Sequence, residues 1–136
     1  MKCIYCGSDT SVSNSRHQKR NNHVWRRRNC TDCGAVFTSS ESADFFKSLS
    51  VKHTGKLQPF SRDKLFLSIY DSLKHRKSPI NDATWLTDTV IGLMYPVIIS
   101  ATVDSQEITK CAVKVLKRFD KVAMTHYSAF HPLSSA

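Results

Sequence analysis

Four cysteines in two closely spaced pairs have the clearest chemistry in this sequence. Cys3 pairs with Cys6 and Cys30 with Cys33, and a glycine follows each pair. Two residues between thiols let one tight turn direct both sulfurs at a single ion, and the glycine permits the positive φ that such turns commonly need. Two such turns form a tetrahedral site of four thiolates, which suits Zn²⁺ better than Mg²⁺ or Ca²⁺. The spacing therefore predicts one structural zinc ion that folds the segment and performs no chemistry.

Other uses of the cysteines fit the pattern less well. A disulfide framework is unusual in a cytosolic chain, and a redox pair would need its Cys-x-x-Cys inside a βαβ pattern, which is absent. An iron or iron–sulfur centre has the same ligands and stays open as an alternative. His17 and His23 lie between the pairs, but four thiolates already complete the shell. The fifth cysteine, Cys111, falls on an apolar stripe and is expected to be buried and unreactive.

The segment between the two pairs is strongly cationic. No acidic residue occurs from Asn14 to Asn29, where six basic residues lie, and Trp25 precedes three of them. The whole chain has 20 Lys and Arg against 11 Asp and Glu, a net charge of +9, which points to a polyanionic partner. A single-signed run with an aromatic neighbour favours contact with nucleic acid. The six basic residues are Arg16, Lys19, Arg20, Arg26, Arg27 and Arg28.

Short strands are expected to position these arginines. The residues that lead into the triplet and residues 35–38 read as strands of a small three-stranded ribbon pinned by the metal. Alternate side chains of a strand face opposite ways. Arg26 and Arg28 are therefore expected to share one face, with Arg27 on the other beside Trp25.

The rest of the chain has the periodicity of a hairpin followed by helices. An α+β chain is therefore predicted, with a three-stranded zinc ribbon at residues 1–45 and a mainly helical domain with an N-terminal β-hairpin at 46–136. Residues 1–46 carry a net 7 − 4 = +3 and residues 47–136 a net 13 − 7 = +6, so the second part is expected to have an anionic ligand of its own.

The elements expected in the second part are a hairpin and four helices. The two strands of the hairpin run from Phe45 to Gln58, with a turn at 53–55. The first helix covers about 62–76 and is capped by Ser61, and the second is capped by Asn81 or Asp82 and breaks at Pro96. The third helix runs from Ser105 to Phe119, and the last contains Val122 and Phe130.

Two further observations limit the class of protein. The most apolar stretch, residues 90–99, is too short to cross a membrane, so it is expected either in the core or in a subunit interface. Gly55-Lys56 resembles the end of a P-loop, but the upstream glycine and the following Ser or Thr are missing. No paired carboxylates, Ser/His/Asp or Cys/His arrangement indicates catalysis, so we expect a cytoplasmic protein that is not an enzyme.

The order of several motifs resembles one bacterial family. The motifs are the two cysteine pairs with the arginine triplet before the second, Phe37-Thr38-x-x-Glu41, Val51 with Lys52, Pro59-Phe60-Ser61-Arg62-x-Lys64-Leu65, and Leu116-Lys117-x-x-Asp120-Lys121-Val122-Ala123. They extend over nearly the whole chain, and together they are similar to NrdR, the repressors of ribonucleotide reductase genes. The resemblance implies a DNA-binding zinc ribbon joined to an ATP-cone that binds adenine nucleotides.

The same resemblance implies roles for individual residues. The nucleotide, ATP or dATP, is expected to select among homo-oligomers (dimer, tetramer or larger) and so to control binding to promoter DNA in the bacterial nucleoid. Residues 90–99 and 108–119 are candidate surfaces between cones. The residues implied for operator DNA are Arg16, Arg26, Arg27 and Arg28, and those implied for the nucleotide are Val51, Lys52, His53, Gln58 and Lys64, with the two lysines at the phosphates.

Two positions depart from the family pattern. His53 stands where members usually have Arg or Lys, and Gln58 stands where they usually have Glu. A neutral Gln keeps hydrogen-bonding capacity and loses charge, so nucleotide affinity or discrimination is expected to differ. These departures favour an alternative in which the ribbon binds nucleic acid constitutively and the cone is a scaffold or docks on a protein partner.

Overall fold

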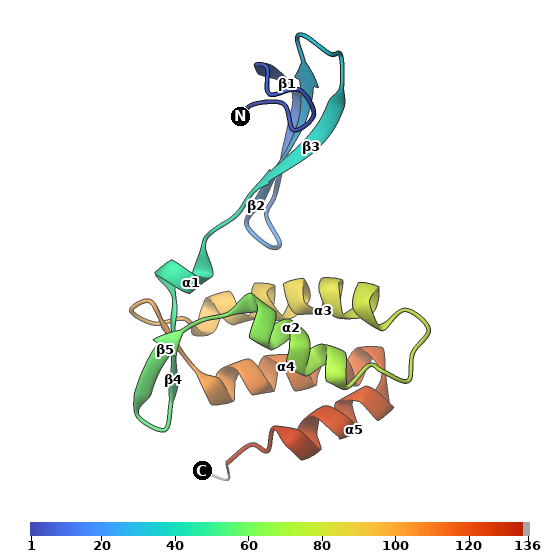
Figure 1. The fold of residues 1–136 in the computed structure, drawn as a ribbon. Coiled ribbons are helices and arrows are strands. Elements are labelled where there is room, and N and C mark those ends of the chain that lie inside the picture. The colour runs from blue at the N-terminus through green and yellow to red at the C-terminus, as the bar shows by residue number, and fades with distance from the viewer. Residues whose placement is uncertain (135–136) are drawn as a thin grey trace. The chain divides into compact units, whose positions relative to one another are not determined.

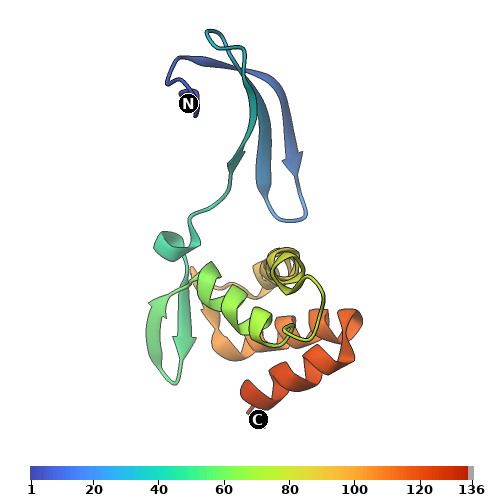
Figure 2. The same cartoon turned by 45° about the vertical axis from the view of Figure 1, so that its right-hand side comes forward.

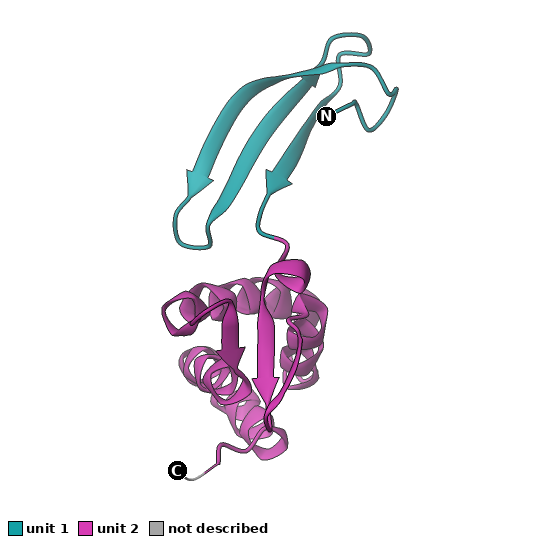
Figure 3. Cartoon of the chain, turned by 90° about the vertical axis from the view of Figure 1, so that its left-hand side faces the viewer, with its two compact units in different colours: residues 1–43 teal, residues 44–136 magenta. Residues whose placement is uncertain are grey.

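The computed structural model describes residues 1–134 and forms two compact units, Met1–Ala43 and Asp44–Ala136 (Figures 1 and 3). The first unit is a β-sheet with four cysteines close together, and the second is mainly helical. The predicted α+β class is therefore confirmed. Within residues 1–134, no helix combines the length and the apolar character needed to cross a membrane.

The first unit is an antiparallel sheet of three strands in the order β1-β2-β3, namely β1 (Thr10–Gln18), β2 (His23–Cys30) and β3 (Val36–Glu41) (Figure 1). Its buried core consists of Cys3, Cys30 and Phe37. A core of three residues removes little apolar surface from water, so burial alone does not hold this unit together. Two of the three core residues are also candidate metal ligands, which ties the fold of the sheet to the metal.

A bulge interrupts the pairing of β1 with β2. Val12 lies opposite Arg28, but the next paired residue, Asn14, lies opposite Arg27. Ser13 is the extra residue, and its hydroxyl donates a hydrogen bond to the carbonyl of Arg27 over 3.3 Å. An extra residue moves every following side chain of the strand to the other face of the sheet. Each β1 side chain after the bulge therefore shares a face with a different set of β2 side chains than it would without the extra residue.

The second unit begins with one helical turn, α1 (Phe45–Ser48), where a strand had been expected. The side chain of Asp44 accepts a hydrogen bond from the amide of Lys47, and the amide of Leu49 closes the turn on the carbonyl of Phe45. This local cap competes with strand pairing and explains the wrong prediction.

A three-stranded sheet follows, in the order β5-β4-β6, with β4 (Ser50–His53), β5 (Lys56–Pro59) and β6 (Thr102–Asp104). The turn between β4 and β5 has positive φ at both Thr54 and Gly55, as tight hairpins require, and it lies where the sequence predicted it. The parallel strand β6 was not predicted. It has only three residues and pairs with β4 across about fifty positions of the sequence, so no local pattern marks it.

Four helices complete the second unit, with the hairpin β4–β5 beside them (Figure 2). They are α2 (Arg62–Asp71), α3 (Pro79–Met94), α4 (Ser105–Phe119) and α5 (Lys121–Phe130), and the short 3₁₀ helix η1 (Tyr95–Val97) follows α3. Their apolar faces meet in one core. The largest fully buried side chains of that core are Ile69, Leu73, Leu86, Val90, Met94, Val103 and Leu116.

The helix ends show where capping was predicted well and where it was not. Ser61 caps α2 as expected, since its side chain accepts from the amide of Lys64. Helix α3 starts earlier than predicted, at Pro79, because proline is preorganised for the first helical position. Asp104, rather than Ser105, caps α4. Helix α3 ends just before Pro96, which confirms the predicted break.

Most of the apolar surface considered for subunit contacts lies in the core of its own unit. Val90, Ile91 and Met94 are buried, and Ile99 at the end of the stretch is 75% exposed. The apolar stripe of α4 packs inward in the same way. Cys111 on that stripe is only partly buried and contacts the core, and burial raises the pKa of its thiol.

Candidate metal centre and nucleic-acid interface

The four cysteine sulfurs form one compact cluster. All lie within 4.8 Å of one another, with 3.8 Å between the Sγ atoms of Cys3 and Cys33 and 3.4 Å between those of Cys6 and Cys30. A tetrahedral zinc ion with Zn–S bonds of about 2.3 Å holds its sulfurs about 3.8 Å apart. The cluster therefore has the size and donor set of a structural zinc site, and none of the histidines of residues 1–134 joins it.

The backbone around the cysteines donates hydrogen bonds to two of the four sulfurs. Gly7 and Gly34 have φ of +79° and +73°, so both pairs use the turn that the sequence predicted. The amide of Tyr5 donates to Sγ of Cys3 over 3.4 Å, and the amides of Asp32 and Cys33 donate to Sγ of Cys30 over the same distance. Amide donors favour the charged form of a thiol, and the amides of Cys6 and Tyr5 lower the pKa of Cys3.

The four arginines predicted to bind DNA have different environments in the sheet. Arg26 lies 3.4 Å from the carboxylate of Glu41. The guanidinium of Arg28 donates to the hydroxyls of Ser39 and Thr10. Arg27 is exposed on β2. Arg16 is exposed on β1, where it lies directly opposite Trp25 of β2. The sheet therefore gathers all four, but only the side chains of Arg16 and Arg27 form no hydrogen bond or ion pair among the described residues.

The residues predicted to bind the nucleotide are not all on one side of the hairpin. Val51 lies opposite Gln58, and His53 lies two positions along β4 on the same face. That face is turned toward the helices, because Val51 packs against the core and Nδ1 of His53 lies 2.8 Å from the hydroxyl of Ser105. Lys52 lies between Val51 and His53 on β4, so its side chain points to the opposite, outer face of the hairpin. Lys64 is exposed in the first turn of α2.

Lys56 is a cation that the sequence prediction left out of the site. It lies directly opposite His53, on the helix-facing side of the hairpin. The only signal for it was its place after Gly55, which had suggested an incomplete P-loop. In the folded unit Lys56 is better placed than Lys52 to meet a ligand held between the hairpin and the helices.

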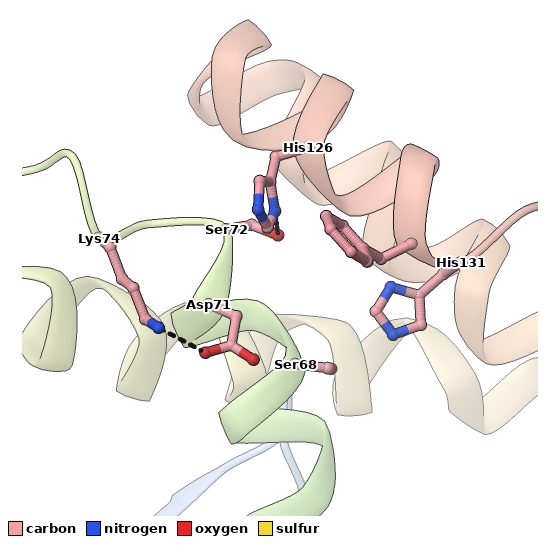
Figure 4. Close-up of a pocket in the computed structure, with 7 residues that line it drawn as sticks. Ser68, Asp71, Ser72, Lys74, His126 and His131 are labelled. Atoms are coloured by element: carbon pink, nitrogen blue, oxygen red, sulfur yellow. Dashed lines mark hydrogen bonds and ion pairs between the residues drawn. The ribbon is translucent and has the colours of Figure 1, made fainter.

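A hollow of about 610 Å³ lies elsewhere in the second unit, between α2 and α5 (Figure 4). Nδ1 of His126 lies 3.0 Å from the hydroxyl of Ser72. The one lysine of the hollow, Lys74, is 3.2 Å from Asp71. Because this lysine is already paired, we assign the hollow no part in the nucleotide site. It is lined by Ser68, Asp71, Ser72, Lys74, His126, Phe130 and His131.

Comparison with known proteins identifies relatives along the whole chain. A family model described as the N-terminal domain of NrdR-like transcriptional repressors, a zinc ribbon, matches residues 1–41. Proteins named transcriptional repressor NrdR from Sinorhizobium medicae and Rhizobium meliloti are each 36% identical over 134 residues, which is 96% of this chain and 83% of the relative. The protein of that name from Agrobacterium fabrum is 34% identical and is covered to 82%.

These matches confirm the resemblance found in the motifs. The relatives are named as transcriptional repressors, so the expectation of a regulatory protein rather than an enzyme is also confirmed. The similarity extends through both compact units, and the matching family model covers the cysteine cluster and the arginine-rich sheet. This chain belongs to the NrdR family of transcriptional repressors.

Proposed function

We propose that this chain is a nucleotide-responsive repressor that binds promoter DNA of ribonucleotide reductase genes through its zinc ribbon. The observation that carries the proposal is family similarity over 96% of the chain, which includes the ribbon and the helical unit together. A zinc ion held by Cys3, Cys6, Cys30 and Cys33 stabilises the ribbon, whose own core is too small to do so. The exposed arginines of β1 and β2 supply the positive charge that phosphates attract.

The second unit, as an ATP-cone, binds ATP or dATP against the hairpin. Lys56, Lys64 and His53 bring cationic or hydrogen-bonding groups there, and lysines can hold a triphosphate as point charges without a Walker loop. Gln58, opposite Val51, supplies a neutral amide. The nucleotide acts only if it binds some homo-oligomeric assemblies more tightly than others. One small ribbon contacts little DNA, so specificity requires several ribbons of one assembly acting together.

Nucleotide binding is expected to stabilise the second unit against heat. At about 100 times Kd, a ligand that binds only the folded state adds about 2.7 kcal/mol, which raises the melting temperature by roughly 11–22 °C for a unit of this size. Thermal melting with ATP, with dATP and without nucleotide measures this. Replacing Lys64 or Lys56 with alanine is expected to weaken binding about tenfold, the effect of one lost charged hydrogen bond.

Lys77→Ala is a matched control, since it removes the same charge from the exposed loop between α2 and α3, at the end of the helices away from the hairpin (Figure 1). It is expected to leave nucleotide affinity within twofold. A melting temperature unchanged by saturating ATP and by saturating dATP would rule out the regulatory half of the proposal.

The constitutive alternative is favoured by the position of Lys52 on the outer face of the hairpin and by the neutral Gln58. Binding to the organism's own reductase promoter, compared for the nucleotide-free, ATP and dATP forms at one salt concentration, separates the two functions. A repressor that responds to nucleotide changes both its DNA affinity and its mass in solution between these forms. A constitutive module changes neither.

A further inference from the structure

The two faces of the ribbon sheet carry different chemistry. Directly opposite residues of an antiparallel sheet lie on the same face, so the register assigns each side chain to one of two sets. We call one set the open face and the other the paired face. The open face includes Asn14, Arg16, Trp25, Arg27, Thr38 and Ser40, and the paired face includes Ser15, Arg26, Arg28, Phe37, Ser39 and Glu41.

Side chains of the paired face already bond with one another. Arg26 forms an ion pair with Glu41 over 3.4 Å, and Arg28 donates to Ser39 over 2.9 Å. Phe37 is buried in the core beside the first cysteine turn, where its ring meets Tyr5 edge-on. These bonds hold β2 to β3 and the sheet to the metal turns. The carboxylate of Glu41 would also repel a phosphate that approached this face.

The open face has uncompensated positive charge. Arg16 and Arg27 form no ion pair with any described residue. The acidic residues of the ribbon are engaged off this face, with Asp9 paired to Lys2, Asp32 accepting from Ser8, and Glu41 on the paired face. Apart from Val36, which lies opposite Asn29, the remaining side chains of the open face are polar groups without formal charge at pH 7 and the partly exposed ring of Trp25.

The bulge at Ser13 makes this arrangement. The pairing before the bulge, if continued, would place Arg16 opposite Val24, on the paired face. The extra residue shifts Arg16 to a position opposite Trp25, two positions along β2 from Arg27. The bond from the Ser13 hydroxyl to the carbonyl of Arg27 holds the shift in place.

We propose that the open face is the surface that meets DNA, and that Arg26 and Arg28 act within the ribbon. This inference rests on the DNA-binding function proposed above. Arg16 and Arg27 bind backbone phosphates, while Asn14 and Trp25 contact base edges between them. A β-ribbon fits the major groove, where an amide can bond an adenine and an apolar group can contact a thymine methyl. Asn14 and Trp25 are thus the residues of the face that carry sequence preference.

Single Arg→Gln variants of the full chain test the proposal, because each removes the same charge at nearly constant length. Binding to two duplexes of equal length, the organism's own reductase promoter and a scrambled sequence, is measured over a range of salt. Arg16→Gln and Arg27→Gln are expected to weaken binding to both duplexes about tenfold, and each is expected to lower the salt slope by about 0.9. Arg26→Gln is the matched control on the paired face, with binding changed by less than about threefold.

Trp25→Leu is expected to reduce the preference for promoter over scrambled DNA by at least about fivefold with the salt slope unchanged, since no phosphate contact is lost. Zinc content and melting temperature show that each variant is folded. The proposal is overturned if Arg26→Gln weakens binding as much as Arg27→Gln, or if Trp25→Leu leaves the preference unchanged. A wild-type chain that binds neither duplex would overturn the proposed function as well, so the two failures are distinguishable.

Discussion

Replacing Cys30 with serine is expected to release the metal and unfold the ribbon while the helical unit stays folded. Cys30 is 5% exposed, and its sulfur lies 3.4 Å from that of Cys6 and accepts hydrogen bonds from two backbone amides. The ribbon has no other sizeable core, and metal binding of this kind supplies about 10–16 kcal/mol of folding free energy. DNA binding is therefore expected to fall more than about a hundredfold, since the arginines lose their scaffold.

Metal content per chain, circular dichroism and DNA affinity measure this prediction. Cys111→Ser is the matched control, because Cys111 is the one cysteine outside the cluster and lies on α4. It is expected to keep one zinc ion per chain and full DNA affinity. Elemental analysis of the wild-type protein separates zinc from iron. If Cys30→Ser retained one equivalent of zinc, the four-thiolate centre would be wrong.

Replacing Asp120 with alanine is expected to destabilise the second unit by about 2–3 kcal/mol. The carboxylate accepts from the amides of Val122 and Ala123 and so caps α5. It also lies 2.8 Å from Nε2 of His75 and 2.9 Å from a guanidinium nitrogen of Arg76, which join α5 to the loop after α2. One side chain thus joins the start of α5 to the loop after α2. Its loss removes the cap and leaves Asp82 as the remaining carboxylate partner of Arg76.

The stability that Asp120 provides is expected to depend on pH. The hydrogen bond from His75, the amides of α5 and the guanidinium of Arg76 hold the pKa of Asp120 well below its usual value of 3.8. A carboxyl with a lowered folded pKa stabilises the protein above its unfolded pKa, and the stability is lost as the pH falls through about 4 toward the folded value. Denaturant melts are therefore expected to separate wild type from Asp120→Ala at pH 7 and to show a smaller difference at pH 3, where the unfolded carboxyl is largely protonated and the folded one is still ionised.

Asp71→Ala is the matched control for this effect. Asp71 forms an exposed pair with Lys74 at i and i+3, and such pairs contribute less than about 0.5 kcal/mol. It is expected to melt like the wild type at both pH values. Equal losses of stability in Asp71→Ala and Asp120→Ala would contradict the special role of Asp120.

Local patterns were sufficient for the cysteine cluster and for most helices. Each cysteine turn is complete within five residues, so its geometry follows from Cys-x-x-Cys-Gly alone. Each turn supplies two thiols, and a tetrahedral zinc ion requires four, which is why the two turns were expected to come together. The helices were predictable because an apolar stripe repeats every three or four residues, and Pro96 ends α3 by removing a hydrogen bond. The hairpin turn at Thr54 and Gly55 is likewise a local preference.

Features that depend on distant parts of the chain could not be predicted in this way. The strand β6 pairs with β4 although β5, α2 and α3 lie between them in the sequence, and His75 and Asp120 meet although 45 residues separate them. The alternation of a strand correctly separated Arg27 from Arg26 and Arg28, because that alternation is a property of one strand. It carried no information on Arg16, which lies on a different strand. The single extra residue at Ser13 decides which face Arg16 joins, and only the paired sheet reveals where that residue is accommodated.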